Sequence, residues 1–262
     1  MLLARLRQGR RTMRFPPSVP ALPERFRGRP VLAGERCAAR APGCDAGRET
    51  AALRHEAEQL PLVDLGASLF CPEETQACPA GAMRFGPEYA MATRTRADLL
   101  TTTGEVRLAT ALDERSRRLF GRSLRLRSVS AGSCNGCEAE LTALGNVVFD
   151  LARFGVQFVA SPRHADGLVV TGAVSRNMLL ALEKTYRAMA DPRLVIAVGV
   201  CAISGGPFRG SPEVLDGVPA DIPVDLYIPG CPPHPLTILD GILRLLGRLE
   251  FRARAGASPR RR

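Results

Sequence analysis

The chain has 262 residues, enough for one large domain or two of ordinary size. Its hydrophobic content of 45% can build a proper core, and no segment approaches the roughly 18 uninterrupted apolar residues of a membrane-spanning helix. The net charge of +10 comes almost entirely from arginine, since Lys184 is the only lysine. With no tryptophan and only 5% aromatic residues, the sequence offers no basic–aromatic platform, so we expect no nucleic-acid partner.

Cysteine usage is the first functional signal. The opening residues lack the long apolar core and the small-residue cleavage site of a secretory signal. In a chain without an export signal, eight cysteines favour metal binding or redox use over a disulfide scaffold.

Residues 1–27 are a basic, mildly amphipathic segment followed by a proline-rich linker. Leucines interleave with arginines up to residue 16, a pattern that suits an anionic membrane surface, the acidic flank of a partner, or simply a solvated terminus. Closely spaced prolines then exclude a helix and predict an extended linker. These prolines are Pro16, Pro17, Pro20 and Pro23.

Two further segments precede residue 124. Residues 28–95 carry many turn residues and no long periodic helix, which predicts a small domain of short elements. Residues 96–123 are polar and rich in arginine, and we interpret them as a connector to a second domain.

Strand and helix patterns alternate over 124–250. Apolar runs predict strands at 124–129, 156–160, 168–171, 194–200 and 224–228. Helical spacing predicts helices over 138–153 and 175–189, the second with an N-cap at Ser175 or a neighbour, and a closing helix around 239–246. This alternation predicts a doubly wound α/β domain, followed by a basic tail at 251–262.

Four cysteines of this domain follow predicted strands, namely Cys134, Cys137, Cys201 and Cys231. Because loops at the carboxyl ends of parallel strands converge on one crevice, these thiols can meet. Gly136 and Gly230 allow close backbone approach, and the first N–H groups of the following helix favour negative charge there. Thiolates select zinc or an iron–sulfur cluster. The spacing alone leaves a zinc half-site or a redox dithiol open at the C-x2-C pair.

Five runs of sequence carry a family resemblance. They are SCNGCE at 133–138, RFGV at 153–156, SPRHAD at 161–166, VGVCAISGG at 198–206 and PVDLYIPGCPP at 223–233. Residues 128–247, which contain these runs in order, resemble the small iron–sulfur subunit shared by respiratory complex I and membrane-bound (group 4) NiFe hydrogenases. The resemblance implies a flavodoxin-like parallel sheet and a single 4Fe–4S cluster on Cys134, Cys137, Cys201 and Cys231.

The resemblance also implies a role for the chain. It implies a non-catalytic electron-relay subunit of an oxidoreductase complex, with a large catalytic subunit packed over the cysteine crevice and membrane subunits in the same complex. The implied location is cytoplasmic, peripheral on the inner face of the cell membrane.

Three interpretations of that role are open. The first two differ in the partner of the chain, and the third is of another class. Complex I typically has adjacent cysteines at the first ligand position, so Cys-Asn-Gly-Cys favours the hydrogenase branch. The quinone-proximal subunit of an NADH:quinone oxidoreductase is the alternative. The third interpretation, from another class, is an assembly scaffold that holds zinc or no metal.

Arg163 and His164 are the candidate residues around the cluster. The resemblance places their loop near it, where a cation would raise the cluster potential. They also fit a surface loop or a cap on the following strand.

The other four cysteines form two pairs of equal spacing. Six residues separate Cys37 from Cys44, and six separate Cys71 from Cys78. The sequence around Cys78 resembles the end of the bacterial two-cluster ferredoxin motif, C-x2-C-x2-C-x3-C-P. This repeat, together with the preceding segment, resembles the two-cluster ferredoxin subunit of the same complexes, here fused ahead of the α/β domain.

When the two cysteine pairs are aligned with the second and fourth cysteines of the ferredoxin motif, which we call the ferredoxin register, each of the two cluster sites is incomplete. The first and third ligand positions of the two motifs hold Ser68 and Glu74 in one, and Gly34 and Arg40 in the other. Each site would keep two cysteines, too few for an ordinary 4Fe–4S cluster. We therefore expect a degenerate α+β ferredoxin-like domain that has lost both clusters.

Overall fold

A computed structural model of the chain describes residues 2–9, 11–18, 20–33, 52–54, 62–76, 78, 81–102 and 105–249, so the predicted basic tail at 251–262 lies outside the described residues. Within these residues the largest sheet has five parallel strands: β6 (Leu124–Ser130), β7 (Val156–Phe158), β8 (Gly167–Thr171), β9 (Leu194–Val198) and β10 (Leu226–Ile228). Their spatial order is β7-β6-β8-β9-β10, the order of doubly wound flavodoxin-like sheets. The predicted α/β class is confirmed.

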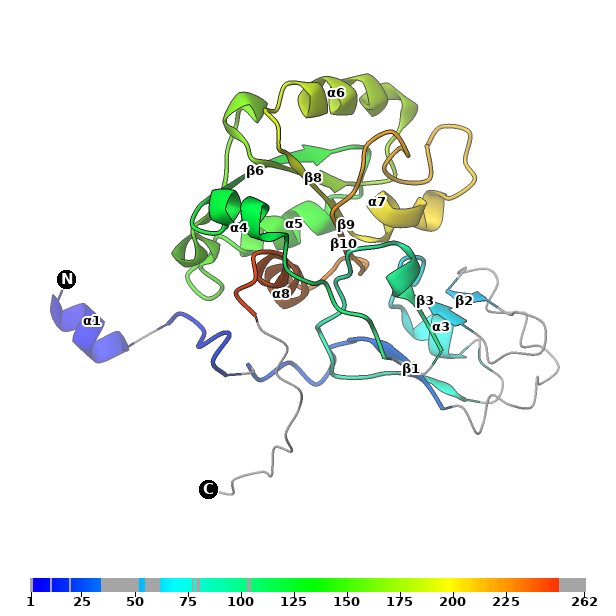
Figure 1. Cartoon of the computed structure of the whole chain (residues 1–262). Helices are drawn as coiled ribbons and strands as arrows, with labels where there is room; N and C mark the ends of the chain where they lie inside the picture. Colours follow the sequence, from blue (N-terminus) through cyan, green and yellow to red (C-terminus); the bar gives the residue numbers. More distant parts are fainter. Residues whose placement is uncertain are drawn as a thin grey trace.

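Helices cover both faces of this sheet (Figure 1). Every residue of β8 and β9 is buried, as expected for central parallel strands with near-continuous apolar sequences. On one face, α5 (Gly136–Ala143) and α8 (Pro235–Leu245) pack on the sheet through residues such as Leu141 and Leu239. On the other face, α6 (Arg176–Arg187) packs through Leu182.

The helix predicted over 138–153 is wrong in its second half, because α5 ends at Ala143. The side chain of Asn146 accepts hydrogen bonds from the N–H groups of Val148 (2.8 Å) and Phe149 (3.0 Å), which favours a turn over a continuing helix. Leu144 and Leu151 are both buried, so the apolar spacing that predicted a helix is satisfied across this turn. A short 3-10 helix, η3 (Leu151–Phe154), then leads into β7.

The other predicted helices are present. Ser175 is the N-cap residue of α6, and His234 caps α8 by accepting the N–H of Leu236 at 3.1 Å. The short helices that were not predicted include α7 (Val200–Ser204), directly after β9, and α4 (Glu114–Phe120), inside the segment interpreted as a connector.

We call the residues before β6, 1–123, the N-terminal half. Short elements make up its described part, which begins with α1 (Leu2–Gln8). Strands β1 (Pro30–Leu32) and β4 (Met83–Phe85) pair antiparallel. A second antiparallel sheet has the order β2-β3-β5. Its strands are β2 (Leu53–Arg54), β3 (Leu62–Asp64) and β5 (Leu100–Thr101), and the helices nearby are α3 (Pro72–Gln76) and η2 (Ala97–Leu99). Strand β5 lies inside the predicted connector, and the ferredoxin-like fold of this half stays a prediction.

The N-terminal half is attached to the main sheet at the outer edge of β10. Thr93 and Tyr227 exchange backbone hydrogen bonds of 3.0 and 2.9 Å in an antiparallel bridge. Apolar residues of both halves share one buried cluster, in which Leu65 and Phe70 pack with Ala202. The edge of the sheet is therefore covered by the chain's own N-terminal half.

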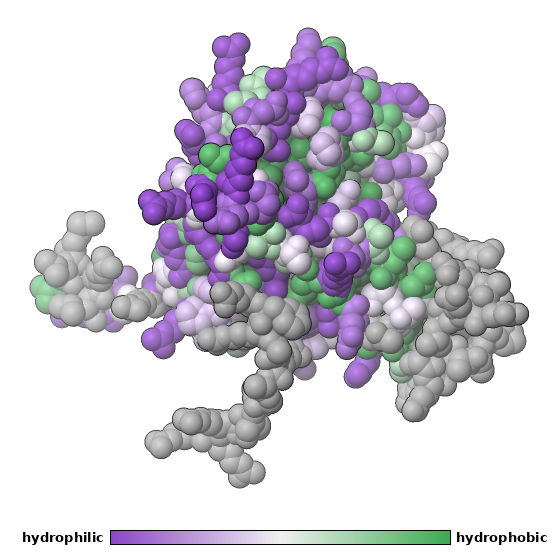
Figure 2. Space-filling view, viewed as in Figure 1, coloured by the Kyte–Doolittle hydropathy of each residue, from purple (hydrophilic) through white to green (hydrophobic). Residues whose placement is uncertain are grey.

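The surface is largely hydrophilic over α6 and α4, with smaller apolar areas between the elements (Figure 2). None of the helices in the described ranges is long and apolar enough to cross a bilayer.

Candidate metal centre

The four cysteines of the α/β domain lie just beyond the carboxyl ends of three parallel strands. Cys134 is in the loop after β6, and Cys137 is in the first turn of α5. Cys201 lies in α7, after β9, and Cys231 follows β10. The strand order reverses between β6 and β8, and the crevice outside the carboxyl ends at such a point is where doubly wound folds bind ligands.

Glycines bring the three cysteine-bearing loops together. A Cβ atom on Gly199 would lie 2.5 Å from the Sγ atom of Cys137, although Gly199 belongs to the loop that carries Cys201. A Cβ atom on Gly136 would lie 3.5 Å from the Sγ of Cys134 and 3.6 Å from Pro232, the neighbour of Cys231. The loops are thus in direct contact, and Gly199, at φ +85°, leaves room beside a sulfur that no other residue could leave.

Backbone hydrogen bonds tie the second and third loops to one another. The N–H of Gly199 donates to the carbonyl of Ile228 at 2.9 Å, and the N–H of Val200 donates to the carbonyl of Gly230 at 3.0 Å. These bonds continue the β9–β10 ladder past the ends of the strands. Cys201 and Cys231 are therefore held in place by the sheet itself.

Side-chain hydrogen bonds around Glu138 shape the first loop. Its Oε1 accepts from Ser133 Oγ at 2.6 Å and from Thr171 Oγ1 at 2.5 Å, so the start of α5 is fastened to the end of β8. Burial opposes ionisation of this carboxyl, but hydrogen bonds from Ser133 and Thr171 lower its pKa overall. Asn135, at φ +68°, makes the turn between the two cysteines.

Three of the four thiols, those of Cys137, Cys201 and Cys231, sit in an environment that disfavours free thiolates. Burial, followed by the nearby Cys201, raises the pKa of Cys137 far above its ordinary value. Burial and the nearby Cys231 raise the pKa of Cys201 to about 11. Burial, and then Cys134, also raises the pKa of Cys231. Mutual repulsion of this kind is relieved when cationic metal atoms bind the sulfurs.

The donor set and the space around it fit a site with four thiolate ligands. All four candidate ligands are sulfur atoms, and the Cβ positions of Gly199 and Gly206 would intrude on the sulfurs of Cys137 and Cys201. Among the described residues, no three His, Cys, Asp or Glu side chains are grouped as ligands of a single metal ion. Ligands of a four-iron cluster bind separate iron atoms, and they therefore stand further apart than ligands of one ion.

Arg163 and His164 are not brought to the cysteines. Both are exposed on the 3-10 helix η4 (Pro162–His164), shortly before β8. Asp166 fixes this loop at the amino ends of the strands, because its side chain accepts the backbone N–H of Arg125 near the start of β6. The cysteines lie at the opposite ends of the same strands. The expected position beside the cluster is therefore corrected to a surface loop that leads into β8.

Sequence reasoning missed three side chains that the structure places near Cys231. Cys71 and Glu74 of the N-terminal half are close enough for their charges to raise the pKa of Cys231, after burial and Cys134. His234 lies between the rings of Phe26 and Phe149, at centroid distances of 5.3 and 6.0 Å. The ferredoxin register singled out Glu74 as a ligand position, but nothing in the sequence signalled its approach to Cys231.

The N-terminal cysteines are only partly described. Cys37 and Cys44 lie outside the described residues, as do Gly34 and Arg40 of the same motif. Cys71 is half-buried just before α3, and Cys78 is buried and accepts the N–H of Ala82 at 3.3 Å.

Known proteins match the part of the chain that carries the four cysteines. A family model described as NADH ubiquinone oxidoreductase, 20 Kd subunit, matches residues 134–245. The probable membrane-bound hydrogenase subunit mbhJ of Pyrococcus furiosus is 43% identical over 132 residues, which cover 50% of this chain and 79% of the relative. The chain belongs to the family of the 20 kDa subunit of NADH ubiquinone oxidoreductase.

Other members of the 20 kDa subunit family show how much of the chain is shared. A relative from Phocaeicola vulgatus, named as a subunit of NADH-quinone oxidoreductase, is 48% identical over 122 residues, which cover 46% of this chain and 61% of the relative. Formate hydrogenlyase subunit 7 of Escherichia coli is 44% identical over 134 residues, which cover 51% of this chain and 52% of the relative. The chain thus spans less than two thirds of the length of these two relatives.

Proposed function

We propose that the chain is an electron-relay subunit of an oxidoreductase complex and that Cys134, Cys137, Cys201 and Cys231 hold one 4Fe–4S cluster. The observation that carries the proposal is the contact among the three cysteine loops at the point where the strand order reverses. When bound, such a cluster supplies one-electron redox chemistry. The chain's own contribution is to fix the thiolates in place and to limit the access of water to them.

Hydrogenase-type complexes are the first candidate for the assembly. The Cys-Asn-Gly-Cys spacing supports this branch, and relatives named as a membrane-bound hydrogenase subunit and a formate hydrogenlyase subunit belong to the family. A quinone-proximal role in an NADH:quinone oxidoreductase is the second candidate, supported by the 48% identity to a relative named for that activity.

The proposed partners are a large catalytic subunit over the cysteine crevice and membrane subunits of the same complex. The exposed side chain of Cys134 supports a partner at this face, since a bound cluster there needs further shielding from water. The proposed location is peripheral, on the cytoplasmic face of the cell membrane.

The N-terminal half is proposed to be a ferredoxin-like remnant without clusters. In support, the side chains at the first and third ligand positions bond to each other, because Ser68 Oγ donates to Glu74 Oε2 at 2.6 Å. A hydrogen-bonded serine and glutamate thus occupy the space where the register would place ligands. We retain the domain limits of 28–95, 96–123 and 124–250 as part of this proposal.

Iron and sulfide analysis of the anaerobically purified full chain tests the cluster assignment. We expect about four iron and four sulfide per chain, with broad absorbance near ~400 nm, and loss of both in Cys231→Ala. A colourless wild-type chain, or one that contains zinc, would overturn the proposal in favour of a scaffold. About eight irons would overturn the claim that the N-terminal half has lost its clusters.

The choice between the two complexes depends on the partner. A tagged chain isolated with its native complex would bring down a nickel-containing large subunit in the hydrogenase case. Stoichiometric recovery of a large subunit without nickel, together with quinone-dependent reoxidation of the cluster, would favour the second candidate.

A further inference from the structure

A segment of the N-terminal half lies directly against the helix that carries Cys201. We call residues 64–76 the cap segment. Ser204 Oγ, at the end of α7, donates to the carbonyl of Gly66 at 2.7 Å. A Cβ atom on Gly66 would lie 2.8 Å from Cγ2 of Ile203, so the backbone at Gly66 packs against the Ile203 side chain as closely as a glycine permits. In Figure 1, β3 and α3 lie below α7, on the side of the N-terminal half.

The same segment also reaches the third cysteine loop. Phe70 and Cys231 line one cavity of about 230 Å³, together with Met91 and Pro232. The cap segment therefore spans from the Cys201 helix to the Cys231 loop, on the side of the cysteines that faces the N-terminal half.

Glu74 fastens the cap segment from within. Its side chain is 1% exposed, and it accepts hydrogen bonds from Ser68 Oγ at 2.6 Å and from the backbone N–H of Leu69 at 2.5 Å. Ser68 Oγ in turn accepts the N–H of Phe70 at 3.2 Å. One buried carboxylate thus fixes three consecutive residues of the loop that touches the cysteine sites.

Burial of a carboxylate is costly unless hydrogen bonds compensate it, and here both oxygens are used within the loop. A degenerate ligand position with no role would more cheaply hold an apolar residue. The retained polar cluster instead fixes the conformation of Ser68, Leu69 and Phe70, with Phe70 placed in the cavity beside Cys231.

We propose that Glu74 is a positioning residue that holds the cap segment over Cys201 and Cys231 and keeps water away from these thiols. The protective role rests on the proposed function, because it requires a cluster. The contacts of the cap segment with the cysteine loops exist in the metal-free chain and can be tested there. The N-terminal half would then have lost its own clusters and would serve to shield the cluster of the α/β domain.

Three variants of the full chain test this. Glu74→Ala removes both acceptors, whereas Glu74→Gln can retain both bonds, because its carbonyl accepts from Leu69 and its amide donates to Ser68. Glu73→Ala is the matched control, since it removes an exposed carboxylate of the same helix one position away.

The first readout needs no cluster. Alkylation of Cys201 and Cys231 in the metal-free chain, followed by mass spectrometry, measures how often the cap opens. We expect a rate about tenfold higher in Glu74→Ala than in wild type, the effect of losing the bonds to one buried carboxylate. Glu74→Gln and Glu73→Ala should both react like wild type.

The second readout uses the loaded chain. Iron release to an external chelator should accelerate in Glu74→Ala by a similar factor, and the midpoint potential followed by electron paramagnetic resonance should rise, because water stabilises the more negative reduced cluster. Equal alkylation rates in wild type and Glu74→Ala would overturn the cap. If Glu74→Ala does not fold, a fast rate in Glu74→Gln would overturn it. Absence of a cluster from wild type, with the alkylation pattern as expected, would overturn only the proposed function.

Discussion

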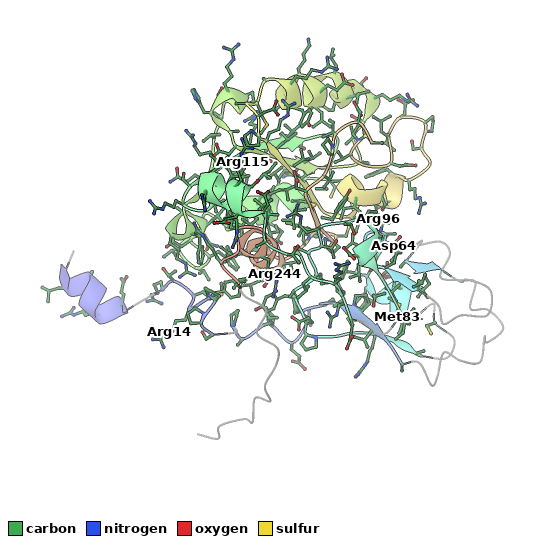
Figure 3. The ribbon with its side chains drawn as sticks, viewed as in Figure 1. Arg14, Asp64, Met83, Arg96, Arg115 and Arg244 are labelled. Carbon is green, nitrogen blue, oxygen red and sulfur yellow. The ribbon has the colours of Figure 1, made fainter. Side chains whose placement is uncertain are left out.

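Arg96 Nη2 lies 2.7 Å from Oδ2 of Asp64, whose side chain is completely buried (Figure 3). Asp64 Oδ1 also accepts the N–H of Gly66 at 3.0 Å. The carboxylate therefore joins the end of β3, the start of the cap segment and the turn before η2. The Arg96 side chain is 30% exposed, so one partner of this ion pair is buried and the other is in contact with solvent.

Arg96→Ala should destabilise the chain through this pair. The substitution removes the charged donor Arg96 from a buried carboxylate, and we expect the free energy of unfolding to fall by about 2 kcal/mol. Arg107→Ala is the control, because Arg107 is 83% exposed and lies 4.0 Å from Asp98, a pair that should contribute less than about 0.5 kcal/mol. Urea unfolding of both variants measures the difference, and equal losses would contradict the role assigned to Asp64.

Gly199→Ala should abolish cluster binding. Its Cβ would lie 2.5 Å from the sulfur of Cys137, so the thiolate would have to move from its position. Gly210→Ala separates crowding from backbone strain, because Gly210 also has a positive φ (+77°) but no atom within 4 Å of the added Cβ. Iron per chain should be near zero in the first variant and unchanged in the second. Loss of iron in both would assign the effect to backbone strain.

His234 should make stability depend on pH. Burial lowers its pKa, so the folded state favours the neutral ring, whose Nδ1 accepts the N–H of Leu236. A lowered pKa contributes stability above the unfolded value of about 6.5, and this contribution is lost as the pH falls through the folded pKa. Arg25, Arg27 and Glu140 share the cavity with the ring.

His234→Asn keeps a cap acceptor without the titrating ring. Between about pH 7 and pH 5, wild type should lose more unfolding free energy than this variant in urea titrations. Parallel curves for the two proteins would show that the ring does not titrate differently on folding.

The N-terminal cysteines should be dispensable for the cluster. Cys71→Ser and Cys78→Ala should each keep about four irons per chain, whereas Cys134→Ser should lose most of them. Cys78→Ala removes a buried sulfur that accepts the N–H of Ala82, so thermal unfolding should be followed alongside the iron content. Loss of iron from a folded Cys71→Ser chain would instead make Cys71 a ligand.

The sheet and the cysteine crevice followed from local patterns. Strands such as 194–198 are continuous apolar runs, and the position of Cys201 and Cys231 after such runs predicts the end of the sheet at which they lie. Helix α5 was predicted too long, because Leu144 and Leu151 keep an apolar spacing across a turn that the side chain of Asn146 stabilises. Apolar periodicity predicts which residues are buried, but it does not predict the backbone conformation between them.

The cap segment could not be predicted for a different reason. Ser68 and Glu74 look like failed ligands in the ferredoxin register, and their hydrogen bond is local enough to infer. Their approach to the α/β domain depends on contacts such as Ser204 with Gly66, which join positions far apart in the chain. Arg163 and His164 were misplaced because the loop around them lies beside the amino ends of β6 and β8, which only the pairing register reveals.

The bridge between Thr93 and Tyr227 sets an order of events during synthesis. The N-terminal half leaves the ribosome first, yet the strand edge on which it docks is the last strand of the sheet to be made. Closure of the two halves is therefore a late step, governed by long-range contacts that form slowly. Until that step the crevice lacks its own cover, so the thiols that have already been made are more accessible to solvent before the two halves close than afterwards.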